Sequence, residues 1–125
     1  MSTHYQITHE GNQVVVRLKG VENIDVAERL WPGVVEACEE HKCFNVLGIA
    51  DTTEPLSAAD SFNHAELFRK LNIDHRYRIA WVELNSDAHE ATSFAELVLS
   101  NRGLPGRLFA DVQDAKEWLR KNSVS

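Results

Sequence analysis

The sequence lacks any long apolar run. Its apolar stretches are far shorter than the roughly 20 residues that a membrane-spanning helix requires. The N-terminus, Met-Ser-Thr-His-Tyr, has neither the charged region nor the apolar region of a secretory signal peptide. We therefore expect a cytoplasmic protein without a membrane span. Its 125 residues are enough for one domain, which we assign to residues 1–125.

Basic residues are too few to form a surface that binds nucleic acid. The chain has 13 Lys and Arg against 19 Asp and Glu, which gives a net charge of −6. Residues 1–60 carry the whole excess, with ten acids and four bases, whereas residues 61–125 have nine of each. No basic stripe is available to follow a phosphate backbone, so nucleic acid is excluded as a partner. Anionic membrane surfaces are disfavoured for the same reason.

The sequence has only two cysteines, Cys38 and Cys43. The apolar pattern around them places Cys38 on the inner face of a helix and Cys43 just past its end. A disulfide between the two would distort that helix, and the reducing cytoplasm also disfavours it. Both residues are therefore interpreted as structural thiols.

The motifs of the common enzyme classes are missing as well. There is no nucleophile elbow, no glycine-rich phosphate loop and no oxyanion-hole signature. None of the six histidines stands at a spacing typical of metal sites. One enzymatic alternative remains, in which His64 approaches Asp51 or Ser61 and acts as the base of a hydrolytic dyad. We expect no enzymatic activity, no catalytic residue and no cofactor.

A metal site at the strand ends is a further alternative. Three strands of the predicted sheet end near Asp51, Glu83 and Asp111, and carboxylates from neighbouring strand ends can bind Mg²⁺. Asp111, however, stands where a helix cap is expected, and the three positions share no ligand spacing. No metal ligand is therefore predicted.

Alternation of apolar and polar residues marks the first two strands. Residues 4–10 and 13–19 both alternate. Gly11 and Asn12 between them suit a tight turn with positive φ angles. The pattern predicts a β-hairpin.

The central element of the sequence is the apolar stretch 44–50, Phe-Asn-Val-Leu-Gly-Ile-Ala. It is too short for a helix and is closed by Asp51-Thr52-Thr53, which is typical of a strand that is buried on both faces. Such a strand predicts a parallel sheet with helices packed on it. Because open α/β sheets bind ligands at the carboxyl ends of their strands, the loop 51–61 is the predicted site.

The first helix is predicted by its cap and its apolar stripe. Asp25 with Glu28 has the spacing of a capping box. Pro32 lacks a backbone donor, so it should kink the helix or split it into two pieces. The inward stripe has helical spacing and consists of Val26, Leu30, Trp31, Val34, Val35 and Cys38.

The later elements follow from the same signals. Asp87 with Glu90 forms a capping box for the third helix, and Gly103 stops that helix near Arg102. Asp111 caps the last helix, which packs inward through Val112, Ala115, Trp118 and Leu119. The predicted elements after the central strand are helix 62–71, strand 75–83, the third helix to residue 102, strand 107–109 and the last helix.

This order of elements resembles the SpoIIAA-like (STAS-type) domain family, and the likeness covers nearly the whole chain. The closing run carries the resemblance most specifically: Asn101-Arg102-Gly103, Arg107, Phe109, Asp111, Ala115 and Trp118-Leu119. The resemblance implies an α/β fold of order β-β-α-β-α-β-α-β-α, with a five-stranded mixed sheet packed with helices. It also implies a non-catalytic module.

Some members of that family are anti-sigma-factor antagonists that are switched by serine phosphorylation. Their serine lies in an Asp-Ser-Ser-Gly run at the start of the helix after the buried strand. The matching place here reads Asp60-Ser61-Phe62-Asn63. Ser61 matches the first serine, but the second serine and the glycine are absent. The chain therefore resembles the stand-alone bacterial members more than the switch proteins.

We expect a binding or regulatory module that acts through the loop 51–61. A protein partner is the leading expectation and predicts an exposed apolar patch on helix 62–71. The alternative is a small apolar or lipid-like ligand in a closed apolar cavity near Trp31 and Trp81. A small hydrolase is the third reading, and an open edge strand predicts a homodimer. The predicted binding residues are Asp51, Thr52, Thr53, Ser57, Ser61 and Phe62.

Overall fold

The sheet has five strands in the order β1-β2-β3-β4-β5, and the computed structural model describes residues 3–121. Strand β1 runs antiparallel to β2, and β2 to β5 are parallel. The predicted order of elements is confirmed, with one short 3₁₀ turn, η1, added. The elements are β1 His4–Glu10, β2 Gln13–Val21, α1 Ile24–His41, β3 Asn45–Glu54, α2 Ala58–Lys70, β4 Arg78–Glu83, η1 Ser86–Ala88, α3 His89–Asn101, β5 Arg107–Phe109 and α4 Val112–Lys121.

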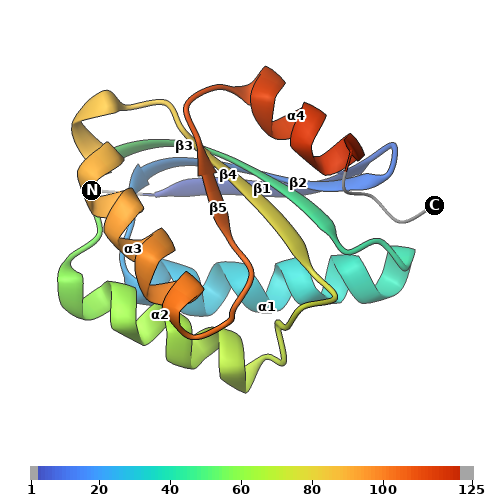
Figure 1. Cartoon of the computed structure of the whole chain (residues 1–125), viewed down its shortest axis with the longest axis horizontal. Coiled ribbons are helices and arrows are strands. Elements are labelled where there is room, and N and C mark those ends of the chain that lie inside the picture. Colours follow the sequence, from blue (N-terminus) through green and yellow to red (C-terminus); the bar gives the residue numbers. More distant parts are fainter. Residues whose placement is uncertain (1–2, 122–125) are drawn as a thin grey trace.

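Helices cover both faces of the sheet (Figure 1). Because successive strand residues point to opposite faces, Val46 packs on the side of α1, α2 and α3, whereas Leu47 packs beneath α4. The first side holds the larger core, to which the three helices contribute Trp31, Phe68 and Leu99. The candidate site lies on this side, between the three helices and the sheet.

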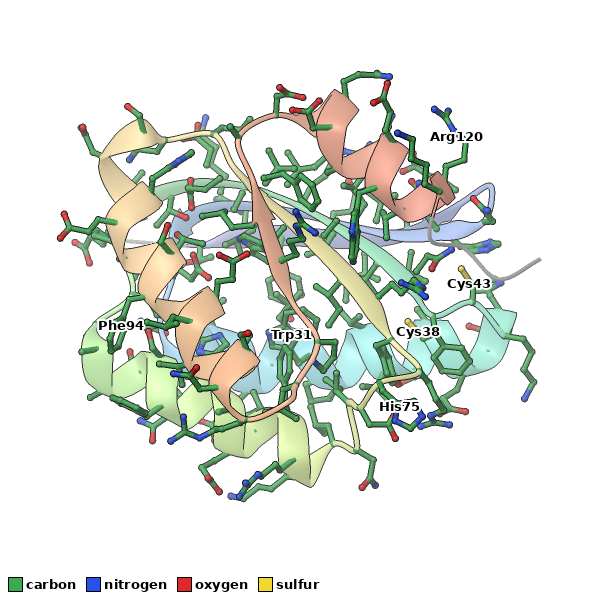
Figure 2. All side chains as sticks on the ribbon, in the orientation of Figure 1. Trp31, Cys38, Cys43, His75, Phe94 and Arg120 are labelled. Carbon is green, nitrogen blue, oxygen red and sulfur yellow. The ribbon has the colours of Figure 1, made fainter. Side chains whose placement is uncertain are left out.

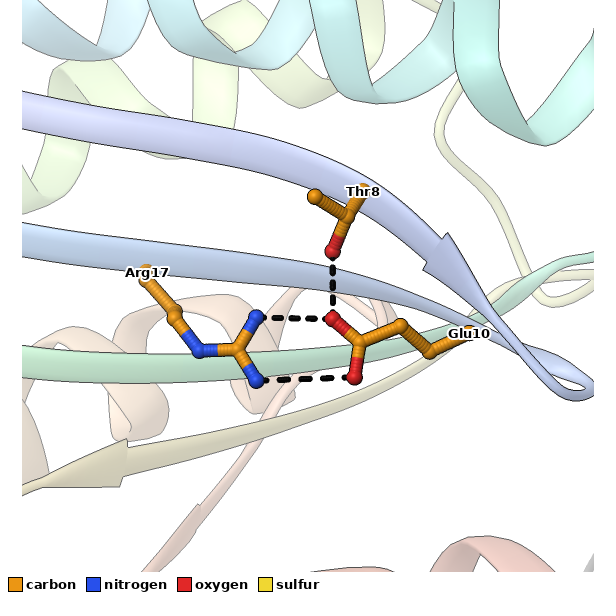
Figure 3. Close-up of polar contacts among 3 residues, drawn as sticks. All are labelled: Thr8, Glu10 and Arg17. Atoms are coloured by element: carbon orange, nitrogen blue, oxygen red, sulfur yellow. Dashed lines mark hydrogen bonds and ion pairs between the residues drawn. The ribbon is translucent and has the colours of Figure 1, made fainter.

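The predicted hairpin is confirmed. Gly11 has a φ angle of 63° in the turn, and Glu10 pairs with Gln13 beside it. The Glu10 carboxylate accepts hydrogen bonds from Arg17 Nη1 at 2.8 Å and from Thr8 Oγ1 at 2.6 Å (Figure 3). The guanidinium of Arg17 and then the hydroxyl of Thr8 lower the pKa of Glu10 to about 2. These groups are exposed, so they stabilise the fold little.

Helix α1 begins two residues earlier than its predicted capping box allows. The cap is Asn23, whose Oδ1 accepts a hydrogen bond from Val26 N at 2.9 Å. The prediction that Asp25 and Glu28 cap this helix is therefore wrong. The expected split at Pro32 does not occur either, since the helix is continuous over 18 residues. Pro32 and Glu28 both lie on the exposed face, where water can satisfy the carbonyl that proline leaves without a donor.

Strand β3 is longer than predicted, and this changes the predicted loop. Asp51 pairs with Lys19, and Thr52 pairs with Gly20, so both residues continue the strand. Threonine is β-branched and favours this conformation. The segment between β3 and α2 contains only residues 55–57, because the helix begins at Ala58. The prediction of a long loop 51–61 followed by a helix from residue 62 is wrong.

The remaining boundaries show one cap that is confirmed and one that is wrong. Asp111 Oδ1 accepts a hydrogen bond from Asp114 N at 2.8 Å, as expected for the cap of α4. The pair Asp87 and Glu90 does not cap α3. Instead, Asn85 caps η1 by accepting a hydrogen bond from the N–H of Asp87, and α3 follows without a side-chain cap.

Strand β4 begins at Arg78 rather than at residue 75, because the residues before it form a turn. Tyr77 N donates to the carbonyl of Asp74 at 3.0 Å, and the Asp74 carboxylate accepts from Arg76 N at 3.0 Å. Strand β5 has the predicted bounds.

Both cysteines are free, as predicted. Cys38 is buried in the core of the helix side, and burial raises its pKa to about 12. Cys43 is only partly buried, and its thiol donates to the carbonyl of Asn12 at 2.9 Å. Within residues 3–121, no helix is both long enough and apolar enough to span a membrane.

Candidate functional site

The three predicted site residues of β3 do not share one face. Asp51 and Thr53 are exposed, whereas Thr52 between them is only 1% exposed. This alternation follows from the pleat of the strand, in which every second side chain points to the same face. Thr52 therefore belongs to the helix side of the sheet, and the structure does not bring Asp51, Thr52 and Thr53 together in one site.

The two predicted serines have structural contacts. Ser57 caps α2 by accepting a hydrogen bond from Asp60 N at 3.1 Å. Ser61 is 0% exposed, and its hydroxyl donates to the carbonyl of Ser57 at 3.3 Å. Ser61, which matches the first serine of the run in the switch proteins, is thus buried inside the first turns of a helix.

Phe62 is exposed and forms an aromatic patch with residues of α3. Its side chain is 45% exposed, and that of Phe94 is 37% exposed. The two rings meet edge to face, with 5.8 Å between their centroids, and Phe94 extends from α3 toward α2 (Figure 2). The guanidinium of Arg102 lies 5.2 Å from the centre of the Phe62 ring. We call Phe62, Phe94 and Arg102 the aromatic patch.

A cavity of about 70 Å³ lies between the sheet and helices α1, α2 and α3. Trp31 of α1 lies inside this region (Figure 2), with its ring centroid 4.8 Å from that of Phe68 and 5.9 Å from that of Trp81. The lining is mostly apolar and includes Leu18, Val26, Leu30, Trp31, Leu56, Phe68, Ile79, Trp81, Ala95, Leu99 and Leu108. We call this space the tryptophan cavity.

Trp81 lies across the sheet because the neighbouring strand has no side chain at that point. Gly48 pairs with Trp81, and a Cβ atom on Gly48 would overlap the indole ring. The indole Nε1 of Trp81 is buried and has no hydrogen-bond partner within the described part of the chain. A buried indole N–H usually has a partner. Trp81 therefore lines the cavity and also holds a buried donor that is unused within the described residues.

Glu22, which also lines the tryptophan cavity, contacts the same Thr52 hydroxyl as the buried carboxyl group of Glu83. Glu83 is 1% exposed and accepts hydrogen bonds from Thr52 N at 3.0 Å, Asn85 N at 3.1 Å and Thr52 Oγ1 at 2.5 Å. The same Thr52 hydroxyl lies 3.2 Å from Glu22 Oε2. Burial, and then the nearby charge of Glu83, raise the pKa of Glu22 to about 7. Glu22 follows a bulge in β2 at Gly20/Val21, and bulges often redirect side chains in this way.

His64 reaches the tryptophan cavity from α2, but it does not form the predicted dyad. Its side chain is 8% exposed, and its Nδ1 lies 3.0 Å from the carbonyl of Asp60, to which it donates. Burial lowers the pKa of His64. Asp51 points to the opposite face of the sheet, and the Ser61 hydroxyl is already bonded to Ser57. The arrangement that the hydrolase reading requires is therefore absent from the described residues.

The strand-end carboxylates do not form a metal centre either. Asp51 is exposed, Glu83 is buried, and Asp111 caps α4. Within residues 3–121, no group of three or more His, Cys, Asp or Glu side chains is placed to hold a metal ion.

Comparison with known proteins supports the fold. No protein-family model and no curated protein sequence matches this chain. A solved structure does match. It is the crystal structure of an uncharacterized protein of the DUF3478 family, with a SpoIIAA-like fold, from Shewanella loihica PV-4. The alignment has a TM-score of 0.54 and 18% sequence identity, and it covers 94% of this chain and 93% of that chain. The fold is SpoIIAA-like.

In this SpoIIAA-like fold, the tryptophan cavity and the aromatic patch are the two features that could bind a partner. Sequence reasoning named Trp31 and Trp81 for the first and Phe62 for the second. It missed Glu22 completely, and it treated Glu83 only as a strand end. The one signal available was Glu83 itself, which is an acid that directly follows the apolar run Ile79–Val82. Nothing in the local sequence links Glu22 to it.

Proposed function

We propose that this protein is a non-catalytic SpoIIAA-like module that binds a small apolar ligand in the tryptophan cavity. The observation that carries the proposal is the mostly apolar cavity between the sheet and α1, α2 and α3, which is lined by Trp31, Phe68 and Trp81. An apolar cavity with a few polar groups is the usual form of a small-molecule site.

The size and the lining of the cavity support a ligand other than water. A buried water needs about 10–15 Å³ and two or more polar partners. The tryptophan cavity of about 70 Å³ exceeds that space several-fold, and most of its wall is apolar. A small apolar molecule, or the end of an alkyl chain, fits these conditions better than a cluster of waters does.

Binding of a neutral apolar dye tests this proposal. We would titrate the protein with N-phenyl-1-naphthylamine, which can insert only part of its ring system into this partly open cavity, and follow dye fluorescence together with quenching of the tryptophans. Ala95→Leu should lower the affinity on the order of tenfold or more, because the larger side chain occupies the cavity. Ser93→Leu is the matched control, since it adds the same side chain to α3 at an exposed position outside the cavity lining.

Thermal unfolding of both variants would show that they remain folded. Native mass spectrometry of gently purified protein would look independently for a bound small molecule. Equal dye affinity in the wild type, Ala95→Leu and Ser93→Leu would contradict binding in the cavity.

The aromatic patch favours a second candidate function, which is binding of a protein partner. Two exposed aromatic rings and an arginine are the residue types that dominate protein interfaces. Phe62 of the patch also lies near the start of α2, the helix that carries the switch serine in the family that the chain resembles. Phe62→Ala should then cost about 1 kcal/mol or more of binding energy.

A pull-down from native lysate separates this second candidate from an unrelated acidic surface. Phe62→Ala removes the central ring of the patch, and Glu39→Lys reverses a charge on the exposed face of α1. If Glu39→Lys abolishes capture of a protein while Phe62→Ala binds like the wild type, the aromatic patch is the wrong surface. Circular dichroism would confirm that both variants are folded.

A further inference from the structure

The polar end of the tryptophan cavity is formed by residues of α2 and of the segment before α1. Asp60 connects the two, because its carboxylate accepts a hydrogen bond from Ile24 N at 3.3 Å and its carbonyl accepts one from His64 Nδ1 at 3.0 Å. Glu22 stands two residues before Ile24 and lines the same cavity as His64. Glu22 and His64 therefore both line the cavity, and Asp60 joins the segments that carry them.

A count of protons determines what Glu22 offers to that ligand. The Thr52 hydroxyl has a single hydrogen, but its oxygen lies 2.5 Å from Glu83 Oε1 and 3.2 Å from Glu22 Oε2. Glu83 also accepts two backbone N–H groups on Oε2, and its Oε1, at the shorter distance, receives this hydrogen. Glu22 has only the longer contact with this hydroxyl, and burial with the nearby charge of Glu83 raises its pKa to about 7, so its carboxyl group is mostly protonated at about pH 6. Its second oxygen, Oε1, is left as a carbonyl-type acceptor.

His64 offers a second acceptor. Its Nδ1 carries the proton, because it donates to the carbonyl of Asp60. The neutral ring therefore has an unprotonated Nε2, and none of the hydrogen bonds found within residues 3–121 uses that nitrogen. The side chain is nine-tenths buried and lines the cavity.

Two acceptors backed by negative charge disfavour an anionic ligand. Glu83 contacts the same Thr52 hydroxyl as Glu22, and the Asp60 carboxylate belongs to the residue whose carbonyl holds His64. An anion at this end would be taken out of water beside like charges and without a donor from either acceptor. A hydroxyl group, in contrast, is uncharged and can donate its hydrogen to Glu22 or His64.

We propose that the tryptophan cavity selects an apolar molecule that ends in an uncharged hydroxyl group, and that it rejects a carboxylate or phosphate end. Glu22 and His64 accept the hydrogen of the hydroxyl, and the apolar lining holds the remainder of the molecule. This inference rests on the proposed function, because it describes the ligand of the same cavity.

Displacement of N-phenyl-1-naphthylamine by three molecules of equal chain length tests the inference. The competitors are 1-octanol, octanoate and octylamine, at about pH 6, where the acid is ionised and the amine is protonated. Octanol should displace the dye at a concentration at least roughly tenfold lower than octanoate does. Equal or tighter binding of octanoate would overturn the inference, and tighter binding of octylamine would overturn the requirement for an uncharged group.

Two variants connect this selectivity to named atoms. Glu22→Leu removes the acceptor at the cavity and should weaken octanol several-fold while dye affinity is kept, and unchanged octanol binding in this variant would exclude Glu22 from the site. His64→Phe removes one acceptor and should weaken octanol several-fold while dye affinity is kept. Unchanged octanol binding in His64→Phe would exclude His64 from the site.

Failure of the two proposals would look different. If Ala95→Leu leaves dye binding unchanged, the dye does not enter the cavity and the proposed function fails. If Ala95→Leu abolishes dye binding but octanoate competes as well as octanol, the cavity binds apolar ligands and only the inference about the hydroxyl group is wrong.

Discussion

Glu22 retains its proton in a pH range in which most glutamates have lost theirs. Its pKa is raised from 4.5 to about 7, first by burial and then by the charge of Glu83. Between these two values the folded protein holds a proton that the unfolded chain has released. The free energy of unfolding must therefore fall as the pH rises through this range. His64 acts in the opposite direction, because its lowered pKa removes stability as the pH falls below about 6.5.

We predict that Glu22→Gln flattens the first of these two dependences. Relative to the variant, the wild type should lose on the order of 3 kcal/mol of unfolding free energy between about pH 4.5 and pH 7. Urea denaturation at a series of pH values would measure this difference. Since His64 is present in both proteins, its contribution cancels. Parallel pH profiles would show that Glu22 is not protonated in the folded state.

Gly48 is the residue whose substitution should disturb the cavity most directly. A methyl group there would overlap the Trp81 ring, so the ring must move from its place on the sheet. We expect Gly48→Ala to cost about 1–3 kcal/mol of stability and to change the affinity for the apolar dye. Gly11→Ala is the control, because a Cβ there meets no atom within 4 Å but has a φ angle of 63°. It should destabilise the hairpin and leave dye affinity unaltered, whereas equal dye affinity in Gly48→Ala would be inconsistent with this geometry.

Among the secondary-structure elements, α1 and α4 differ in their relation to the site. Both have a side-chain cap, Asn23 for α1 and Asp111 for α4. Asn23 also lines the tryptophan cavity, whereas α4 packs on the opposite face of the sheet. The two caps therefore allow a comparison between loss of a cap near the site and loss of a cap far from it.

Asp111→Ala should destabilise the protein by about 1 kcal/mol without changing ligand binding. Asn23→Ala should cost a similar amount and also weaken dye binding. Denaturation midpoints and dye titrations of both variants would measure these effects. An unchanged midpoint in Asp111→Ala would mean that Asp111 does not act as a cap in solution.

Over the whole molecule, the two edges of the sheet differ in length. Strand β5 has three residues, but β1 has seven and presents an unpaired edge. Long open edges favour pairing with another chain. We therefore expect self-association through β1, in agreement with the homodimer predicted from the sequence.

Sedimentation velocity at increasing concentration would test for this dimer. Gln6→Lys places a charge in the exposed part of β1 and should shift the equilibrium toward monomer. A single monomeric species at every concentration would refute association through this edge.

The order of elements, the hairpin and the apolar stripes follow from periodicity, which depends only on neighbours in the chain. The errors arose where two local readings competed. Asn23 and Asp25 are both good helix caps, and only the path of the chain into α1 selects Asn23. Asp51-Thr52-Thr53 reads as the start of a loop, but pairing with β2 keeps these residues in the strand. In both cases a contact outside the local window decided the outcome.

The sequence by itself determined the SpoIIAA-like order of strands and helices, the buried central strand and the apolar surroundings of Trp31 and Trp81. Only the tertiary structure decided that Ser61 is buried, that Phe62 is exposed beside Phe94, and that Glu22 meets Thr52 and Glu83. The physical reason is the parallel sheet. Its neighbouring strands are far apart in the chain. The contacts of the Thr52 hydroxyl with Glu22 and Glu83 therefore join residues that are 30 and 31 positions apart in the sequence. Such contacts have no periodicity that a local pattern can reveal.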